Sequence, residues 1–321
     1  MKGYFTKRIV FALLSVFVIS FIYFMLFAAI PGDPAMNEVM HYRGLVSDEE
    51  FNELYAQARQ RLGLDLPLMQ RYARWLSSTL KGDIGYSTYY KQNALDVIKT
   101  PLLTTLLLNG TAFIIAISSS IPLGIYFARI KGSALDTLSQ VIFMVIYSLP
   151  SFILGLLLLY VFSVKLMLLP MSASGGIAGY IIPVSVLALS SIATLQKYIR
   201  ASVFDTMGEQ YIKTARGKGL KESRVFFLHA WPNARIPSVT VIINQAVRIF
   251  GGSLIVENLF LINGLGRLFY TSLMNQDWEL AVAASMLYAV AALIGGFCAD
   301  WMYGKLDPRV RLSGGDAFGN S

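Results

Sequence analysis

Six long apolar runs, separated by polar segments, dominate the pattern of this 321-residue chain. A helix crosses a bilayer with about 20 mostly apolar residues, at a rise of about 1.5 Å per residue. Each run is close to that length, so the pattern predicts an all-α membrane protein with six transmembrane helices. The predicted spans are residues 9–30, 101–128, 135–164, 179–195, 236–256 and 280–303.

Three of these runs allow further predictions. The first run has no charge and is longer than the roughly 7–15-residue apolar core of a signal peptide, so we expect a retained helix. Pro150 lies inside the third run and predicts a kink, because proline removes a helical hydrogen bond and clashes with the preceding turn. The fourth helix is expected to continue past Lys197.

The first long polar stretch covers residues 31–100, which is too long for a connector and too apolar for a disordered linker. Apolar positions recur at helical spacing over 51–58 and 70–76. Asp65 is expected to cap the second helix, with Pro67 near its first turn. Two interpretations stay open: a small helical cap over the outer mouth, or a docking surface for an external partner.

The composition supports a membrane protein. Hydrophobic residues make up 55% and charged residues 14% of the chain, and the mean hydropathy is +0.56. A soluble domain carries about 25% charged residues, so neither a disordered chain nor an ordinary soluble domain fits.

The net charge of +8 comes from an excess of Lys and Arg on one side of the predicted membrane. Segments on the same side as the N-terminus hold 16 Lys and Arg against 7 acids, whereas the opposite segments hold 10 against 12. Lys and Arg collect on the cytoplasmic side of membrane proteins. We therefore expect a multi-pass protein of the cell membrane, with both termini cytoplasmic, a lipid environment and no nucleic-acid partner.

Residues for catalysis or metal binding are scarce. One cysteine and two histidines allow neither an internal disulfide, nor a cysteine zinc cage, nor a histidine metal site. A phosphate-binding loop needs G-x4-G-K-[ST], but Gly-Lys occurs only at 217–218 and 304–305, and neither is followed by Ser or Thr. We therefore expect no catalytic residue, no metal, no cofactor and no enzyme activity in this chain.

The second polar stretch, 196–235, is basic and contains helix-compatible segments at about 209–229. Gly219 can end the first short helix, because glycine adopts positive φ readily. Small residues would let another surface approach the backbone. The alternative is a positively charged loop that rests on lipid headgroups. The residues singled out here are Tyr211, Lys213, Thr214, Ala215, Arg216, Lys218, Gly219 and Leu220.

This stretch resembles the "EAA" cytoplasmic loop of binding-protein-dependent ABC importer permeases, E-A-A-x3-G-x9-I-x-L-P. Lys213-Thr214-Ala215 takes the first three places, Gly219 the glycine and Pro232 the proline, while the Glu is absent. The local sequence is most similar to the dipeptide/oligopeptide branch. Further matches to its B-type subunit occur at Pro31–Pro34, Leu62–Pro67, Gly82–Ser87, Gly264–Gly266 and Asp307–Arg309.

The resemblance implies a type I importer permease: residues 1–30 as tail and first helix, 31–100 as an extracytoplasmic helical insertion, 101–311 as a five-helix core and 312–321 as a tail. It implies a homologous C-type permease, two cytoplasmic ABC ATPases and an extracytoplasmic solute-binding protein as partners. ATP and Mg would be bound by the ATPases. The short inner helix would be the coupling helix, seated in a groove of one ATPase, so that ATPase closure tilts the spans.

A polar group within the fifth predicted span is the candidate for the translocation path. Asn244, Gln245 and Arg248 are spaced to share one helix face, and an ionisable residue inside a span usually faces protein or water. Arg248 could meet a substrate carboxylate or carbonyl, or an acid of the partner permease. The alternative is an arginine that snorkels or pairs with Glu257. Glu257 itself resembles part of the family's outer gate region.

The expected function is therefore the permease of an ATP-driven oligopeptide or dipeptide importer, half of whose path this chain would form. Related permeases carry other solutes, so nickel or glutathione remains an alternative substrate. A membrane-embedded enzyme is disfavoured by the missing catalytic set. A self-sufficient secondary carrier is also an alternative, although such carriers often show internal repeats and the two halves here show no convincing one.

Overall fold

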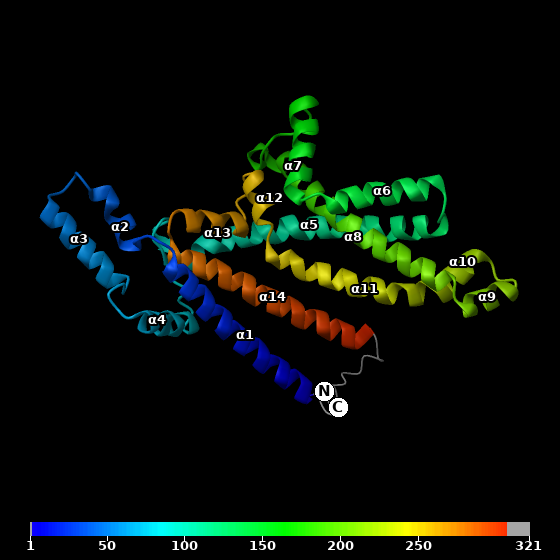
Figure 1. Ribbon diagram of the computed structural model, residues 1–321, viewed down its shortest axis with the longest axis horizontal. Helices are drawn as coiled ribbons and strands as arrows, with labels where there is room; N and C mark the ends of the chain where they lie inside the picture. Colours follow the sequence, from blue (N-terminus) through cyan, green and yellow to red (C-terminus); the bar gives the residue numbers. More distant parts are fainter. Residues whose placement is uncertain (1, 307–321) are drawn as a thin grey trace. The chain divides into compact units, whose positions relative to one another are not determined.

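The computed structural model describes residues 2–306, and these residues divide into two compact units (Figure 1). The first unit holds the described residues up to Thr105 together with Asn263–Ala291. The second unit holds Leu106–Ile262 and the described residues from Ala292 onward. Helices α5 and α14 contribute residues to both units.

The first unit is helical apart from one short hairpin. Its hairpin pairs β1 and β2 antiparallel, with Tyr86 opposite Asn93 and Ser87 opposite Gln92. Its elements are α1 (Lys2–Ala29), α2 (Pro34–Val39), a 3-10 turn (Met40–Tyr42), α3 (Asp48–Arg61), α4 (Leu68–Leu80), β1 (Tyr86–Ser87), β2 (Gln92–Asn93), α13 (Leu265–Met274) and parts of α5 (Ala94–Arg129) and α14 (Trp278–Leu306).

The local sequence explains where α3 begins and why α4 begins only after Pro67. The Ser47 hydroxyl accepts a hydrogen bond from the Glu50 amide at 3.3 Å, and acids fill the first turn of α3, which suits the positive end of the helix dipole. The prediction that Asp65 caps α4 was wrong. Asp65 instead accepts a hydrogen bond from Arg59 Nε at 3.0 Å, and α4 starts after Pro67 without a side-chain cap.

The second unit contains the remaining helices. They are α6 (Ala134–Ser148), α7 (Ser151–Leu159), a π-helical turn (Tyr160–Lys165), a 3-10 segment (Ala173–Tyr180), α8 (Ile181–Met207), α9 (Gln210–Gly217), α10 (Glu222–Val225), a second π-helical turn (Phe226–Ala230), α11 (Trp231–Val247), a 3-10 turn (Arg248–Gly251) and α12 (Leu254–Leu259). Helix α8 packs along both α6 and α11.

The kink predicted at Pro150 is confirmed, and it is a sharp turn. Helices α6 and α7 meet at 107°, so that α7 stands across the direction of α6 in Figure 1. Leu149 is extended (φ −79°, ψ 130°), as expected for a residue before proline, and α6 ends there. Ser133 caps the other end of α6 by accepting a hydrogen bond from the Asp136 amide.

The predicted helical membrane fold is confirmed, whereas the predicted count of six spans is not reached. Within residues 2–306, four helical stretches are long and apolar enough to cross a membrane, or five if the α6–α7 pair forms one span. The span predicted over 236–256 is broken. Helix α11 has 17 residues and ends at Val247, and Gly252, at φ +66°, separates the following 3-10 turn from α12. The four stretches are Ile9–Ala29, Ala94–Arg129, Ala173–Met207 and Trp278–Ala299.

Candidate functional site

Helix α9 presents two different faces. Ile212 and Ala215, three residues apart, are buried with 0% and 6% exposure. Tyr211, Lys213 and Thr214 are exposed. The exposed set continues through Arg216, Gly217, Lys218 and Gly219. The apolar face therefore fixes α9 to its own unit, while its cationic face is open.

A cluster of buried apolar side chains holds this segment in place. Ile212 and Ala215 pack in one cluster with Val225 and Phe226, on the same core as Leu195 of α8. The Arg129 guanidinium, at the end of α5, lies 4.5 Å from the Phe226 ring centroid, a cation–π distance. The remaining buried members of the cluster are Ala116, Ala128, Ile192, Ile199, Val203, Ala230 and Ala234.

The C-terminal end of α9 is shaped by glycine and by one ion pair. Gly219 has φ +77°, so the backbone leaves the helix through the left-handed region. Arg216 bridges to Glu222 of α10 through Nε and Nη2, at 2.7 and 3.2 Å. A side chain added at Gly217 would meet no other atom within 4 Å. The backbone at Gly217 is therefore accessible to another molecule.

A second polar contact ties α8 to the start of α6. The Asp136 carboxylate accepts hydrogen bonds from Arg200 Nε at 2.8 Å and Nη2 at 2.7 Å, and also from the Gly132 amide at 3.0 Å. The two side chains are only 5% and 18% exposed. A two-pronged pair with these bonds is well suited to hold the loop before α6 in a fixed position. Sequence analysis did not identify this pair, because no local spacing joins residues 64 positions apart.

The predicted path residues fall in different elements. Asn244 is exposed and Gln245 partly buried, both near the end of α11. Arg248 belongs to the following 3-10 turn, and its side chain lies outside the described part of the chain. Glu257 is buried in α12, where its carboxylate accepts a hydrogen bond from the Ser253 amide at 3.3 Å.

Sequence analysis missed a contact at the end of α11. Asn109, in α5, donates a hydrogen bond from its amide to the Ile249 carbonyl at 3.2 Å. A 3-10 turn leaves main-chain groups without regular helical partners, and an amide side chain can satisfy one of them. The signal in the sequence was an asparagine inside an apolar run.

The family model described as "Binding-protein-dependent transport system inner membrane component" matches residues 120–312. A second model, for the N-terminal part of such membrane components, matches residues 1–128. The chain belongs to this family of binding-protein-dependent importer permeases. Residues 210–230, whose geometry is described above, lie within the first match.

The permease has full-length relatives. It is 32% identical over 311 residues to the glutathione transport system permease protein GsiC of Escherichia coli strain K12, covering 97% of this chain and 99% of the relative. The GsiC proteins of Escherichia coli strain CFT073 and of Shigella dysenteriae strain Sd197 match with the same identity and coverage.

A solved structure supports the fold independently. A crystal structure described as an amino acid ABC transporter with histidines aligns with a TM-score of 0.51 at 18% identity, covering 66% of the permease and 94% of that chain. At this identity the alignment supports the fold alone. The permease therefore has the helical fold of that solved chain. The family models, rather than this alignment, show that it is a multi-pass membrane component of an ABC importer.

Proposed function

We propose that the permease is the membrane subunit of an ATP-driven importer of small peptides. It forms half of the translocation path, and a homologous C-type permease forms the other half. Two cytoplasmic ATPases bind ATP and Mg, and an extracytoplasmic binding protein delivers the solute. Both termini lie in the cytoplasm. The family membership and the excess of Lys and Arg on one side support this arrangement.

The two-faced helix α9 is the observation that carries the proposal. Its buried side, Ile212 and Ala215, is packed on the same core as α8, so a push on α9 is transmitted to a long helix. Its exposed side offers Lys213 and Lys218 and the open backbone at Gly217. A groove lined by acids on an ATPase would be complementary in charge and shape. Closing of the ATPases would then move α9 and α8 as a rigid body.

The test places a bulky side chain on the exposed face of α9. Gly217→Trp places an indole at an exposed position where an added Cβ meets nothing within 4 Å, so we expect the permease itself to fold normally. The complete importer, reconstituted in liposomes with its binding protein, should lose uptake of a labelled dipeptide by at least roughly tenfold, the factor that 1.4 kcal/mol of lost contact energy gives. ATP hydrolysis stimulated by the binding protein should fall in parallel.

Gly217→Ala is the matched control, because it changes the same residue by one methyl group. We expect it to keep uptake and stimulated ATP hydrolysis near the parent values. Thermal unfolding of both variants should match that of the parent permease. Unchanged uptake by the tryptophan variant would contradict the role of α9 as the coupling helix.

Glutathione is the second candidate solute, because GsiC relatives named for glutathione transport match 97% of the chain. Glutathione is itself a tripeptide, so both candidates share a backbone amide and a carboxylate. Competition in the same liposome assay separates them. Glutathione that displaces a labelled dipeptide completely, at lower concentration than unlabelled dipeptide does, would make glutathione the preferred solute.

The path residues remain part of the proposal. We assign Asn244, Gln245 and Arg248 to the lining of the path, on the sequence argument that polar groups inside a span face protein or water. Glu257, which is buried in α12, is assigned to the outer gate region of the path, on the resemblance to the family. Replacing Arg248 by Ala should impair uptake while the importer still assembles. Normal uptake by that variant would remove Arg248 from the path.

A further inference from the structure

A cavity of about 440 Å³ lies entirely within the first unit. Its wall is formed by the end of α1 and the loop that leads into α2, the end of α3 and the loop that leads into α4, one face of α4, the hairpin region and the start of α14. Pockets that bind small molecules have volumes of about 300–1,000 Å³. The cavity is therefore large enough for a small ligand. We call it the arginine pocket, after Arg59, Arg61, Arg71 and Arg74, which line it.

Helix α4 contributes a continuous polar face to the arginine pocket. Arg71, Arg74, Trp75 and Ser78 line the cavity and are spaced i, i+3, i+4 and i+7, which places them along one side of a helix. The neighbouring face of α4 is anchored elsewhere. Tyr72 is buried, and its hydroxyl lies 2.9 Å from that of Ser20 in α1.

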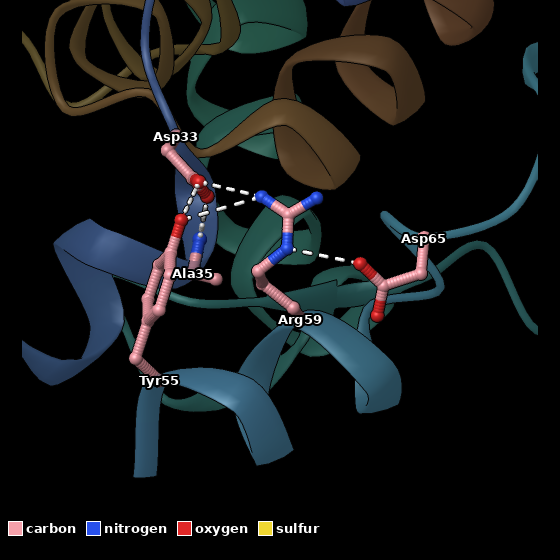
Figure 2. Close-up of polar contacts among 5 residues, drawn as sticks. All are labelled: Asp33, Ala35, Tyr55, Arg59 and Asp65. Atoms are coloured by element: carbon pink, nitrogen blue, oxygen red, sulfur yellow. Dashed lines mark hydrogen bonds and ion pairs between the residues drawn. The ribbon is translucent and has the colours of Figure 1, made fainter. Parts of the chain in front are cut away.

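The carboxylates of the pocket already have hydrogen-bond partners. Figure 2 shows Asp33 accepting from the Tyr55 hydroxyl at 2.5 Å, from Arg59 Nη1 at 3.0 Å and from the Ala35 amide at 2.9 Å. The Glu279 carboxylate accepts from the Tyr86 amide at 2.6 Å, and that of Asp83 accepts from the Gly85 amide at 3.1 Å. Arg59 is shared between Asp33 and Asp65, also seen in Figure 2.

The side-chain hydrogen-bond donors that α4 contributes to the arginine pocket have no such partners. Among the described residues, no hydrogen bond or ion pair joins the guanidinium of Arg71 or of Arg74 to an acceptor. The indole Nε1 of Trp75 is shielded from solvent and has no acceptor either. Burial lowers the pKa of Arg71, and the positive charge of Arg59 lowers that pKa further. A bound anion would offset both effects.

Aromatic side chains form the rest of the lining. Phe24 and Phe27 of α1 and Trp278 at the start of α14 line the cavity beside the arginines. Aromatic walls combined with a few convergent polar groups are typical of small-molecule sites. A ligand that fits has a negatively charged oxygen group at one end and an apolar group next to it.

We propose that the arginine pocket binds an oxyanion, a carboxylate or a phosphate, that is attached to an apolar group. Arg71 and Arg74 bind the oxygens, and the aromatic side chains pack on the apolar part. Two ligands share this chemistry: the carboxylate end of a small peptide and the headgroup of an anionic lipid. The site is separate from α9, so it does not depend on the coupling proposal.

The test measures binding to the full-length permease in nanodiscs, without ATPases. One arm titrates the dipeptide Ala-Phe and its C-terminal amide into discs of phosphatidylcholine. The other arm uses native mass spectrometry to ask whether phosphatidylglycerol stays bound when the discs contain it. Arg71→Gln removes the charge. Arg43→Gln is the control, because Arg43 is an exposed arginine of the same unit and does not line the pocket.

We expect the parent and the Arg43→Gln variant to bind one of the two probes, and Arg71→Gln to bind it at least roughly tenfold more weakly, as for a lost charge-assisted hydrogen bond. Binding of Ala-Phe but not of its amide identifies a peptide carboxylate as the ligand. Retention of phosphatidylglycerol identifies a lipid headgroup. Binding of neither probe, or equal binding by the Arg71 variant, overturns the proposal.

Discussion

Asp33 shows how one side chain can join several segments of the first unit. Its carboxylate caps α2 through the Ala35 amide and reaches Tyr55 and Arg59 of α3 (Figure 2). Burial raises the pKa of Asp33. The hydrogen bonds from Tyr55 and from the Ala35 and Met36 amides, together with the charge of Arg59, outweigh this effect and lower the pKa below its ordinary value. The ionised carboxylate is therefore the stabilising form.

The lowered pKa of Asp33 predicts that the stability of the permease depends on pH. A carboxyl group whose pKa is lower in the folded chain than in the unfolded chain stabilises the fold at pH values above its ordinary pKa. This stabilisation is lost as the pH falls through the lower pKa of the folded state. We expect Asp33→Asn to destabilise the permease by about 1–2 kcal/mol at neutral pH. The deficit should shrink as the parent becomes protonated below about pH 4. Thermal unfolding in nanodiscs across this pH range measures both effects.

Glu53→Gln is the control for this prediction, because Glu53 is exposed on the same helix as Tyr55 and Arg59 and forms no hydrogen bond or ion pair within the described residues. Its unfolding temperature should follow that of the parent at every pH. A deficit for Asp33→Asn that stays constant down to about pH 3 would contradict the assigned role of the carboxylate.

Helices α7 and α12 pack closely against each other. A Cβ added at Gly155 in α7 would lie 3.0 Å from Leu259 Cδ2 and 3.3 Å from the Phe260 ring. A side chain at position 155 would therefore crowd the place where these two elements touch. Sequence analysis predicted the break at Pro150, since the restriction on Leu149 is local. The break after Val247 has no proline signal at that point; the two glycines at 251–252 within the predicted span 236–256 are the local feature that permits it.

We predict that Gly155→Leu separates α7 from α12 and destabilises the permease by about 1–3 kcal/mol, the range for overpacking a well-packed core. The lowered unfolding temperature can be measured by intrinsic tryptophan fluorescence. Gly110→Leu is the matched control. Gly110 also lies in an apolar helix, but a Cβ there would meet nothing within 4 Å. Equal destabilisation by both variants would contradict the packing argument.

At the scale of the whole molecule, family membership determines what the permease can do alone. Matches to two family models extend over residues 1–312, and these models describe a membrane component rather than a complete transporter. The two-faced helix α9 is consistent with this, because its apolar face is packed within the chain while its cationic face is exposed and available to a partner. Energy for uphill transport would therefore come from outside the chain.

We predict that the purified permease in liposomes accumulates no labelled dipeptide under a proton or sodium gradient. The complete importer with ATP and binding protein should accumulate it, because in the proposed mechanism closing of the ATPases moves α9. Scintillation counting of washed liposomes measures both. Accumulation by the permease alone under an ion gradient would instead identify a self-sufficient carrier.

The sequence by itself determined the membrane class, most of the spans and the family, because apolar length, charge asymmetry and motif spacing are local or additive along the chain. It also located the segment that contains α9. Only the tertiary structure decided that Asp136 meets Arg200, that Asn109 reaches Ile249, and that Arg71 finds no acceptor among the residues that the structure describes. Such contacts join residues far apart in the chain, and their partners depend on how helices pack rather than on any period in the sequence.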